Sequence, residues 1–494
     1  MLKGRIKEPM AEEFKELSFP GIVADYRDAF DEMYYINAAH TVMLCDNKII
    51  KKQTAVDILR ALKDIQATLQ ESDLSVDRGN DLYLNIESQL IDRIGIDAGG
   101  RMHTGRSRND LSSTMLRMTT RKKILETVAN IVSLQKSILV MAEEYKDAVF
   151  TGYTHMQPAQ PTTVGHYLIM CVNSLSRDSG RLMDAYKRTN LCALGAAAFA
   201  GTGFPIDRLE TAELLGFDGV VENSWDCVVS RDYAMEVEAA YAILCTNISR
   251  IAQDMFIWCT DEFNTFELGG EISGTSSIMP QKKNPSPLER TKTAASGGVS
   301  AFVDSAAALK NAPFGFCGDA FRIPPTLASV HKDVLTCLRY MNLVMTHSSF
   351  HRERMEKMSD LNFSTATSLA DMLVRDYDIS FRNAHHIVAG MVGDVKDKGE
   401  GIGAATPDLL KKWSKTVLGS EIDIDEEDLA KALSARGNVE SKASLGGPAP
   451  SCMESMLRHS AENVNNTEHW LEERSEAIEN AYAQLEKIVD EVTR

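Results

Sequence analysis

The chain has 494 residues, 44% of them hydrophobic and 25% charged, which is the composition of a soluble globular protein with about three domains. Its formal net charge of −17 argues against nucleic acid or an anionic membrane as a partner, because both require a basic surface. A small anionic substrate would therefore have to meet a local cluster of positive charge.

The nine cysteines are scattered and form no C-x-x-C pair, a pattern typical of reduced thiols in a cytoplasmic protein. The N-terminus has no apolar run of signal-peptide length. No stretch approaches the ~18 continuous apolar residues that span a membrane. Adjacent His385 and His386 point in different directions on a helix and make a poor metal pair, so we expect neither metal nor cofactor.

The first part of the chain, up to about residue 105, predicts short helices joined by loops, with apolar residues at helical spacing over 49–69. After Gly105, residues 107–150 contain neither Gly nor Pro and predict one long helix. At ~1.5 Å per residue it would span roughly 65 Å, a length that suits the strut of a helix bundle.

A polar and basic cluster lies at the start of this predicted helix. It consists of Arg106, Ser107, Arg108 and Asn109. A helix N-terminus adds its own partial positive charge and free amide groups. Any one of these residues is explained by helix capping or solvation, but the group together favours an anion-binding site.

A second polar segment, residues 151–161, contains two prolines and predicts a loop between helices. It carries Thr154 and His155. A single histidine is more often structural than catalytic, yet its titration near neutrality makes His155 a candidate for proton transfer or for tuning charge.

The segment 223–268 also lacks Gly and Pro and predicts a second long helix, with Asn223 as its cap. Arg231, near its start, either binds a carboxylate or pairs with a neighbouring acid. The following residues, 274–285, include a Gly-Thr-Ser-Ser run and two prolines, so they predict a loop. Its hydroxyls, two ammonium groups and carboxamide are suited to holding a carboxylate beside a reactive hydroxyl.

The remaining sequence also predicts helices. We expect a helix over 288–309 interrupted at Gly297-Gly298, a long helical stretch over 326–360, shorter helices within 363–392 and 423–433, and a charged amphipathic terminal helix over 465–492.

The polar segments carry a family resemblance. Ser-Ser-Ile-Met-Pro-x-Lys-x-Asn-Pro, starting at Ser276, resembles the signature loop of the fumarase/aspartase superfamily, and its Gln-Lys-Lys form is similar to that of argininosuccinate lyases. Residues 104–110 resemble a further signature of that branch, and residues 152–161 resemble the second superfamily signature. The likeness extends over about residues 40–453.

The resemblance implies a mainly α-helical protein with the three-domain fumarase/aspartase fold. The expected domains are an N-terminal helical domain (1–105), a central long-helix bundle that carries the signature loop (106–355), and a C-terminal helical domain (356–494). It also implies a homotetramer with a core of about twenty helices. The active sites would be composite, each built where segments of three subunits meet.

The implied reaction is a reversible β-elimination that releases fumarate from an N-substituted aspartate. Ser276 would be the base, while Lys282 and Asn284 would stabilise the doubly negative aci-carboxylate. His155 would lie by the leaving nitrogen or tune the site, supported by Glu289 of another chain. The remaining residues implied in substrate binding or support are Ser107, Arg108, Asn109, Thr154, Arg231, Ser277, Met279 and Phe316.

The segment that would hold arginine departs from the family pattern Tyr-Asn-x-Asp-Leu-Gln-x-Asp-Lys. Phe316, Phe321 and Pro324 replace its tyrosine, glutamine and lysine, and Ser286 replaces an acid after Asn-Pro. We therefore expect a different amine, as in ethylenediamine-disuccinate lyases. The alternatives are an argininosuccinate lyase proper and, from another class, a non-catalytic crystallin-like structural protein.

Overall fold

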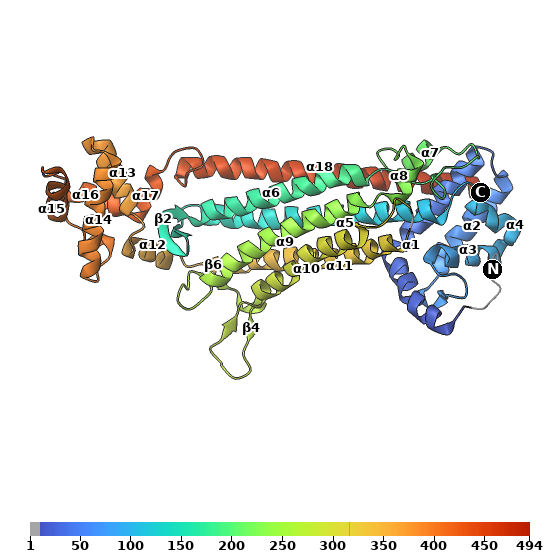
Figure 1. Cartoon of the computed structure of the whole chain (residues 1–494), viewed down its shortest axis with the longest axis horizontal. Coiled ribbons are helices and arrows are strands. Elements are labelled where there is room, and N and C mark those ends of the chain that lie inside the picture. The colour runs from blue at the N-terminus through green and yellow to red at the C-terminus, as the bar shows by residue number, and fades with distance from the viewer. Residues whose placement is uncertain (1–9, 316) are drawn as a thin grey trace.

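Long helices run side by side through the middle of an elongated molecule (Figure 1). The computed structural model describes residues 10–315 and 317–494. The helices of this central bundle are α5 (Arg108–Glu144), α6 (Val164–Thr189), α9 (Asp232–Trp258), α10 (Ser286–Leu309) and α11 (Ile323–Thr346). They meet in one large apolar core, in which Ile124, Val128 and Ile131 of α5 are fully buried.

Helix α5 starts where the sequence predicts. Ser107 is its N-cap: the Ser107 hydroxyl accepts a hydrogen bond from the Asn109 amide, and the Ser107 amide donates to the Asp110 carboxylate. This reciprocal capping satisfies amide groups that lack partners inside the helix. The helix ends at Glu144, earlier than predicted, because the chain then enters a strand. Among the described residues, α5 alone has the length and apolar composition of a membrane span, but it is the core helix of this bundle.

Three predicted features of the bundle are wrong. Helix α10 continues through Gly297-Gly298 without interruption. A Cβ at Gly298 would lie 2.8 Å from the Cys245 Cβ, so this glycine permits close packing of α10 on α9. The long helix predicted over 326–360 is also broken, because strand β6 (Ser348–Phe350) separates α11 from α12 (Arg352–Leu361) and pairs with β3 (Phe266–Leu268). The segment 223–268 likewise divides into α8 (Ser224–Val229), α9 and β3.

The N-terminal unit has its own apolar core. Its first helix, α1 (Glu12–Asp46), is much longer than the short helices predicted there, and it is kinked at Ala29. The unit also contains α2 (Lys52–Thr68), η1 (Glu71–Asp73), α3 (Leu82–Ile94), α4 (Ile96–Gly99) and η2 (Gly100–His103). Helix α7 (Arg208–Leu214) packs against it.

A smaller helical unit lies at the opposite end of the molecule (Figure 1). It consists of α13 (Ala366–Tyr377), α14 (Phe381–Asp397), η5 (Ile402–Ala404), α15 (Pro407–Leu418), α16 (Glu426–Leu433) and α17 (Ala435–Ser441). The last helix, α18 (Pro450–Thr493), starts earlier than predicted and runs back along the bundle. Its Leu485 and Val489 join the N-terminal core. The domain limits at 105 and 355 stay a prediction.

Candidate active site

The polar cluster at the start of α5 lies where the bundle meets the N-terminal unit. Arg108 is exposed, and its Nη1 lies 2.6 Å from the carboxylate of Asp81, the residue that also caps α3. Asn109 donates from its side chain to the Ala198 carbonyl (3.1 Å). Nothing in the sequence indicated that Asp81 pairs with Arg108, because 27 residues separate them.

The neighbouring arginine has a different environment. Arg106 is 6% exposed and donates to the Asn37 side chain at 2.5 Å, with its guanidinium 5.3 Å from the Tyr83 ring. His103 is hydrogen bonded to the Tyr83 hydroxyl at 2.7 Å. Burial, together with the charges of Arg106 and Arg108, lowers the pKa of His103 to about 4. His103 is therefore neutral at physiological pH. The sequence analysis did not single it out.

The segment predicted as a loop around His155 is instead a β-hairpin. Strand β1 (Val149–Thr154) pairs with β2 (Gln157–Thr163), and Thr154 lies opposite Gln157. His155 and Met156 form the turn with φ of 52° and 59°. Positive φ at both residues is the geometry of a type I′ turn, which matches the twist of the strands. The hairpin thus holds the His155 and Thr154 side chains exposed at its tip.

The predicted signature loop is confirmed as an irregular segment, with a short strand pair at its base. β4 (Gly274–Thr275) pairs with β5 (Lys283–Asn284), and the tip projects away from the bundle (Figure 1). A side chain at Gly274 would collide with the Ser286 hydroxyl. The Ser276 Oγ accepts hydrogen bonds from the amides of Ile278 (3.3 Å) and Met279 (3.0 Å). Two such donors would stabilise an alkoxide at Ser276.

One of the two lysines of this loop forms an ion pair within the chain, and the other does not. Lys283 forms an ion pair with Glu267 at 2.8 Å, whereas Lys282 is exposed and has no ion-pair partner among the described residues. Glu289 is exposed in the first turn of α10. The remaining predicted loop residues reach solvent: Ser277 and Met279 are exposed and Asn284 is half-buried in β5.

Arg231 is 6% exposed, and its guanidinium hydrogen-bonds the Ser113 hydroxyl (3.2 Å) and the Ser230 carbonyl (2.6 Å). It forms no ion pair within the described part of the chain. Of the two roles considered for it, pairing with a neighbouring acid is therefore wrong, and carboxylate binding stays a prediction. Phe316 lies outside the described residues. The altered positions near it fall in η4 (Gly318–Arg322) and in the first turn of α11.

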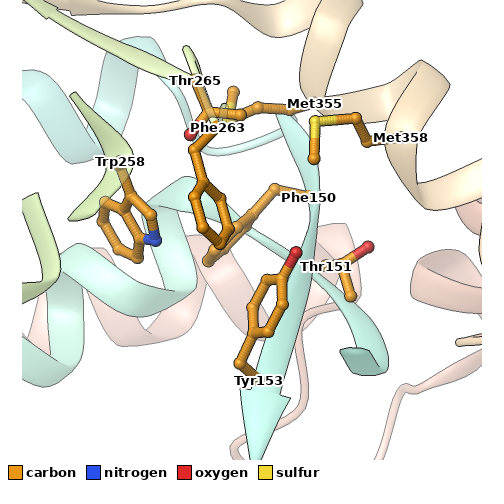
Figure 2. Close-up of a pocket in the computed structure, with 8 residues that line it drawn as sticks. All are labelled: Phe150, Thr151, Tyr153, Trp258, Phe263, Thr265, Met355 and Met358. Carbon is orange, nitrogen blue, oxygen red and sulfur yellow. The ribbon is translucent and has the colours of Figure 1, made fainter. Parts of the chain in front are cut away.

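A single chain does not bring the three polar segments together. Arg108 is the first residue of α5, and His155 lies past the other end of this helix, whose 37 residues span about 55 Å. The Ser276 loop leaves the bundle at a third place (Figure 1). A small, mostly apolar cavity of about 20 Å³ lies against strand β1 of the hairpin (Figure 2), and the residues that line it include none of the predicted site residues. Residues 10–315 and 317–494 include no cluster of three His, Cys, Asp or Glu side chains arranged for a metal ion.

The chain is thus a bundle of long helices that exposes three separated polar segments. Comparison with known proteins shows the family. A model described as Lyase matches residues 16–298, and one described as Argininosuccinate lyase C-terminal matches residues 363–440. The argininosuccinate lyase of Methanocaldococcus jannaschii is 38% identical, covering 97% of this chain and 96% of that protein. Argininosuccinate lyase 1 of Shouchella clausii is 35% identical, with coverage of 97% and 96%.

The chain belongs to the argininosuccinate lyase family. It is an enzyme, a carbon–nitrogen lyase that releases fumarate, and the crystallin-like alternative finds no support. Among solved structures, EDDS lyase in complex with formate is 32% identical, with a TM-score of 0.88 and coverage of 99% of this chain and 97% of that chain. A fumarate lyase from Mesorhizobium sp. BNC1 (17% identical, TM-score 0.72, coverage of 92% and 99%) shares the fold. These likenesses confirm the predicted fold class.

Proposed function

We propose that the enzyme works as a homotetramer with composite active sites, and that its substrate is an N-substituted aspartate whose amine is not arginine. The observation that carries the first part is the separation of Arg108 from His155 by the length of α5. Groups that must contact one small substrate can then meet only across subunits. Family membership supports such an assembly.

In the composite site, Ser276 removes the proton beside a substrate carboxylate. The amides of Ile278 and Met279 that donate to its Oγ favour the alkoxide, and the unpaired ammonium group of Lys282 adds positive charge. Lys282 and Asn284 stabilise the doubly negative intermediate. Arg108, Ser107, Asn109 and Thr154 bind the succinyl carboxylates. His155 either donates a proton to the leaving nitrogen or tunes the charge, and Glu289 of a further subunit supports it.

The amine pocket is the part in which this chain differs from the family pattern. Phe316, Phe321 and Pro324 stand where the family has tyrosine, glutamine and lysine. A guanidinium left without partners would cost about 1–3 kcal/mol for each unpaired polar group. The structural likeness to EDDS lyase supports an aminocarboxylate substrate. Argininosuccinate is the second candidate, and the identity to argininosuccinate lyases over nearly the whole chain favours it.

The identity of the amine is tested by measuring the reverse reaction, in which an amine adds to fumarate. Loss of fumarate absorbance is followed when the enzyme is mixed with fumarate and, in turn, arginine, ethylenediamine and other amines. We expect consumption with a diamine or aminocarboxylate and none with arginine. Consumption with arginine alone would establish the second candidate, and an inert protein would contradict both.

The composite site is tested by mixing subunits. Ser276→Ala and His155→Ala chains are each expected to be inactive, but random mixed tetramers should recover about one quarter of the wild-type activity, because a site then draws its two residues from different chains. The double variant in one chain, carried through the same unfolding and mixing, is the control. Inactive mixtures would show that both residues come from one subunit.

We also propose a cytoplasmic location, in keeping with nine cysteines that are all free thiols. Cell fractionation tests it, and recovery of the enzyme outside the cytoplasmic fraction would overturn it.

A further inference from the structure

The C-terminal unit contains an open cleft that the catalytic proposal does not use. The cleft has a volume of about 510 Å³ and lies between α13, α16 and α17, at the far end of the molecule (Figure 1). None of the residues assigned to catalysis lines it. Helices α16 and α17 meet tightly at one side, where a Cβ at Gly437 would lie 2.8 Å from the Lys431 carbonyl oxygen.

The most unusual residue that lines the cleft is Asn438. Its side chain is 2% exposed, yet neither its Oδ1 nor its Nδ2 has a hydrogen-bond partner among the described residues. An unpaired buried amide is costly, and almost all buried polar groups in folded proteins are satisfied. Asn438 thus keeps an unused acceptor and two unused N–H donors in the wall of the cleft.

Unused charges of both signs lie at the same cleft. Asp428 and Lys431 are three residues apart on α16, both line the cleft, and neither forms an ion pair within the described residues. The other two charged groups of the lining, Arg375 and Asp376, are joined by two hydrogen bonds of 2.8 and 2.9 Å. The free charged groups are therefore one carboxylate and one ammonium group, and the buried amide of Asn438 lies in the same lining.

We propose that this cleft is a second ligand site, for a small zwitterion that carries an ammonium and a carboxylate group, such as a free α-amino acid. The ammonium group pairs with Asp428 and the carboxylate with Lys431. The amide of Asn438 accepts from the ammonium group and donates to the carboxylate. Met372 and Ala432 supply apolar surface for a side chain. The site is independent of the catalytic proposal, because it shares no residue with it.

The test measures binding of free amino acids to the intact enzyme by equilibrium dialysis. Wild type is expected to bind at least one of them, and the dissociation constant should rise at least about tenfold in Asn438→Leu, Lys431→Gln and Asp428→Asn. Substitution of the buried Asn438 can disturb folding. Lys431 and Asp428 are exposed, so their variants should fold normally and test the site even if Asn438→Leu does not fold. Lys398→Gln, an exposed lysine of the same unit outside the cleft, is the matched control and should bind as wild type.

The variant Arg108→Gln distinguishes binding at this cleft from binding at the catalytic site. Binding that survives Arg108→Gln but is lost in the cleft variants supports the proposal. Binding that is lost in Arg108→Gln and kept in the cleft variants belongs to the catalytic site and overturns it. The proposal also fails if no amino acid binds wild type at millimolar concentration, since the cleft then holds only water.

Discussion

Lys283 Nζ lies 2.8 Å from the Glu267 carboxylate and thereby ties the strand pair at the base of the Ser276 loop to β3. Glu267 also contacts His351, and Lys283 and His351 together hold the pKa of Glu267 below its ordinary value. Of the two adjacent lysines, Lys283 is therefore paired within the chain, whereas Lys282 forms no ion pair with any residue that the structure describes.

This relationship gives a matched pair of variants. Lys282→Met should lower kcat by about 10²–10³-fold, because it removes the charge that we propose stabilises the intermediate. Lys283→Met should leave kcat nearly unchanged and cost about 0–1 kcal/mol of stability, as loss of an exposed ion pair does. Steady-state kinetics and thermal unfolding of both variants check this. An equal loss of kcat in the two would mean that the loop geometry, and not Lys282, is critical.

Ser276→Ala should reduce kcat by about 10²–10⁴-fold, because it removes the proposed base. The substitution also removes the acceptor of two amide hydrogen bonds within the loop. Since the loop lies outside the apolar cores, the assembly should stay intact. Kinetics with gel filtration measures both properties, and normal turnover would disprove the assignment of the base.

Arg108→Gln should lower kcat/KM by about 10–100-fold, since a hydrogen bond to a charged group contributes about 1.5–3 kcal/mol. Arg108→Lys keeps the charge but loses the planar fork, so an intermediate value is expected. The exposed pair with Asp81 contributes little to stability, so both variants should unfold near the wild-type Tm. Unchanged kcat/KM in both would remove Arg108 from the site.

The buried position of Glu238 predicts how the free energy of unfolding depends on pH. Its side chain is fully buried in the central bundle, with a hydrogen bond from Ser305 (2.9 Å), and burial raises its pKa from 4.5 to about 7. The folded protein thus keeps a proton that the unfolded chain loses above pH 4.5. Stability should therefore fall as the pH rises from 4.5 to about 7 and then level off.

Glu238→Gln should abolish this contribution. The variant should be more stable than wild type by about 1–3 kcal/mol at slightly alkaline pH, and the two should converge in acid, where the glutamate is protonated in both states. Thermal unfolding of both proteins across this range checks the prediction. A difference that does not vary with pH would show that Glu238 does not titrate as described.

The sequence-based predictions were correct where a feature depends on residues a few positions apart, and wrong where it depends on contacts between distant segments. The start of α5 is set by Ser107 and Asp110, three residues apart, and was predicted correctly. The break at Gly297-Gly298 was predicted from local propensity and is wrong, because contact with Cys245 of a distant segment makes small residues favourable inside α10. The hairpin at His155 was missed because its prolines occupy positions in a two-stranded ribbon that a larger sheet would not tolerate.

The sequence by itself determined the start of α5, the polar segments and, through the residues of those segments, the family. Tertiary structure alone decided that Arg106 is buried while Arg108 faces solvent, that Lys283 is paired while Lys282 is not, and that α5 separates the polar segments along its length. The reason is physical: helix starts and turns depend on neighbours a few residues away, whereas burial and ion pairing depend on segments that only packing brings together.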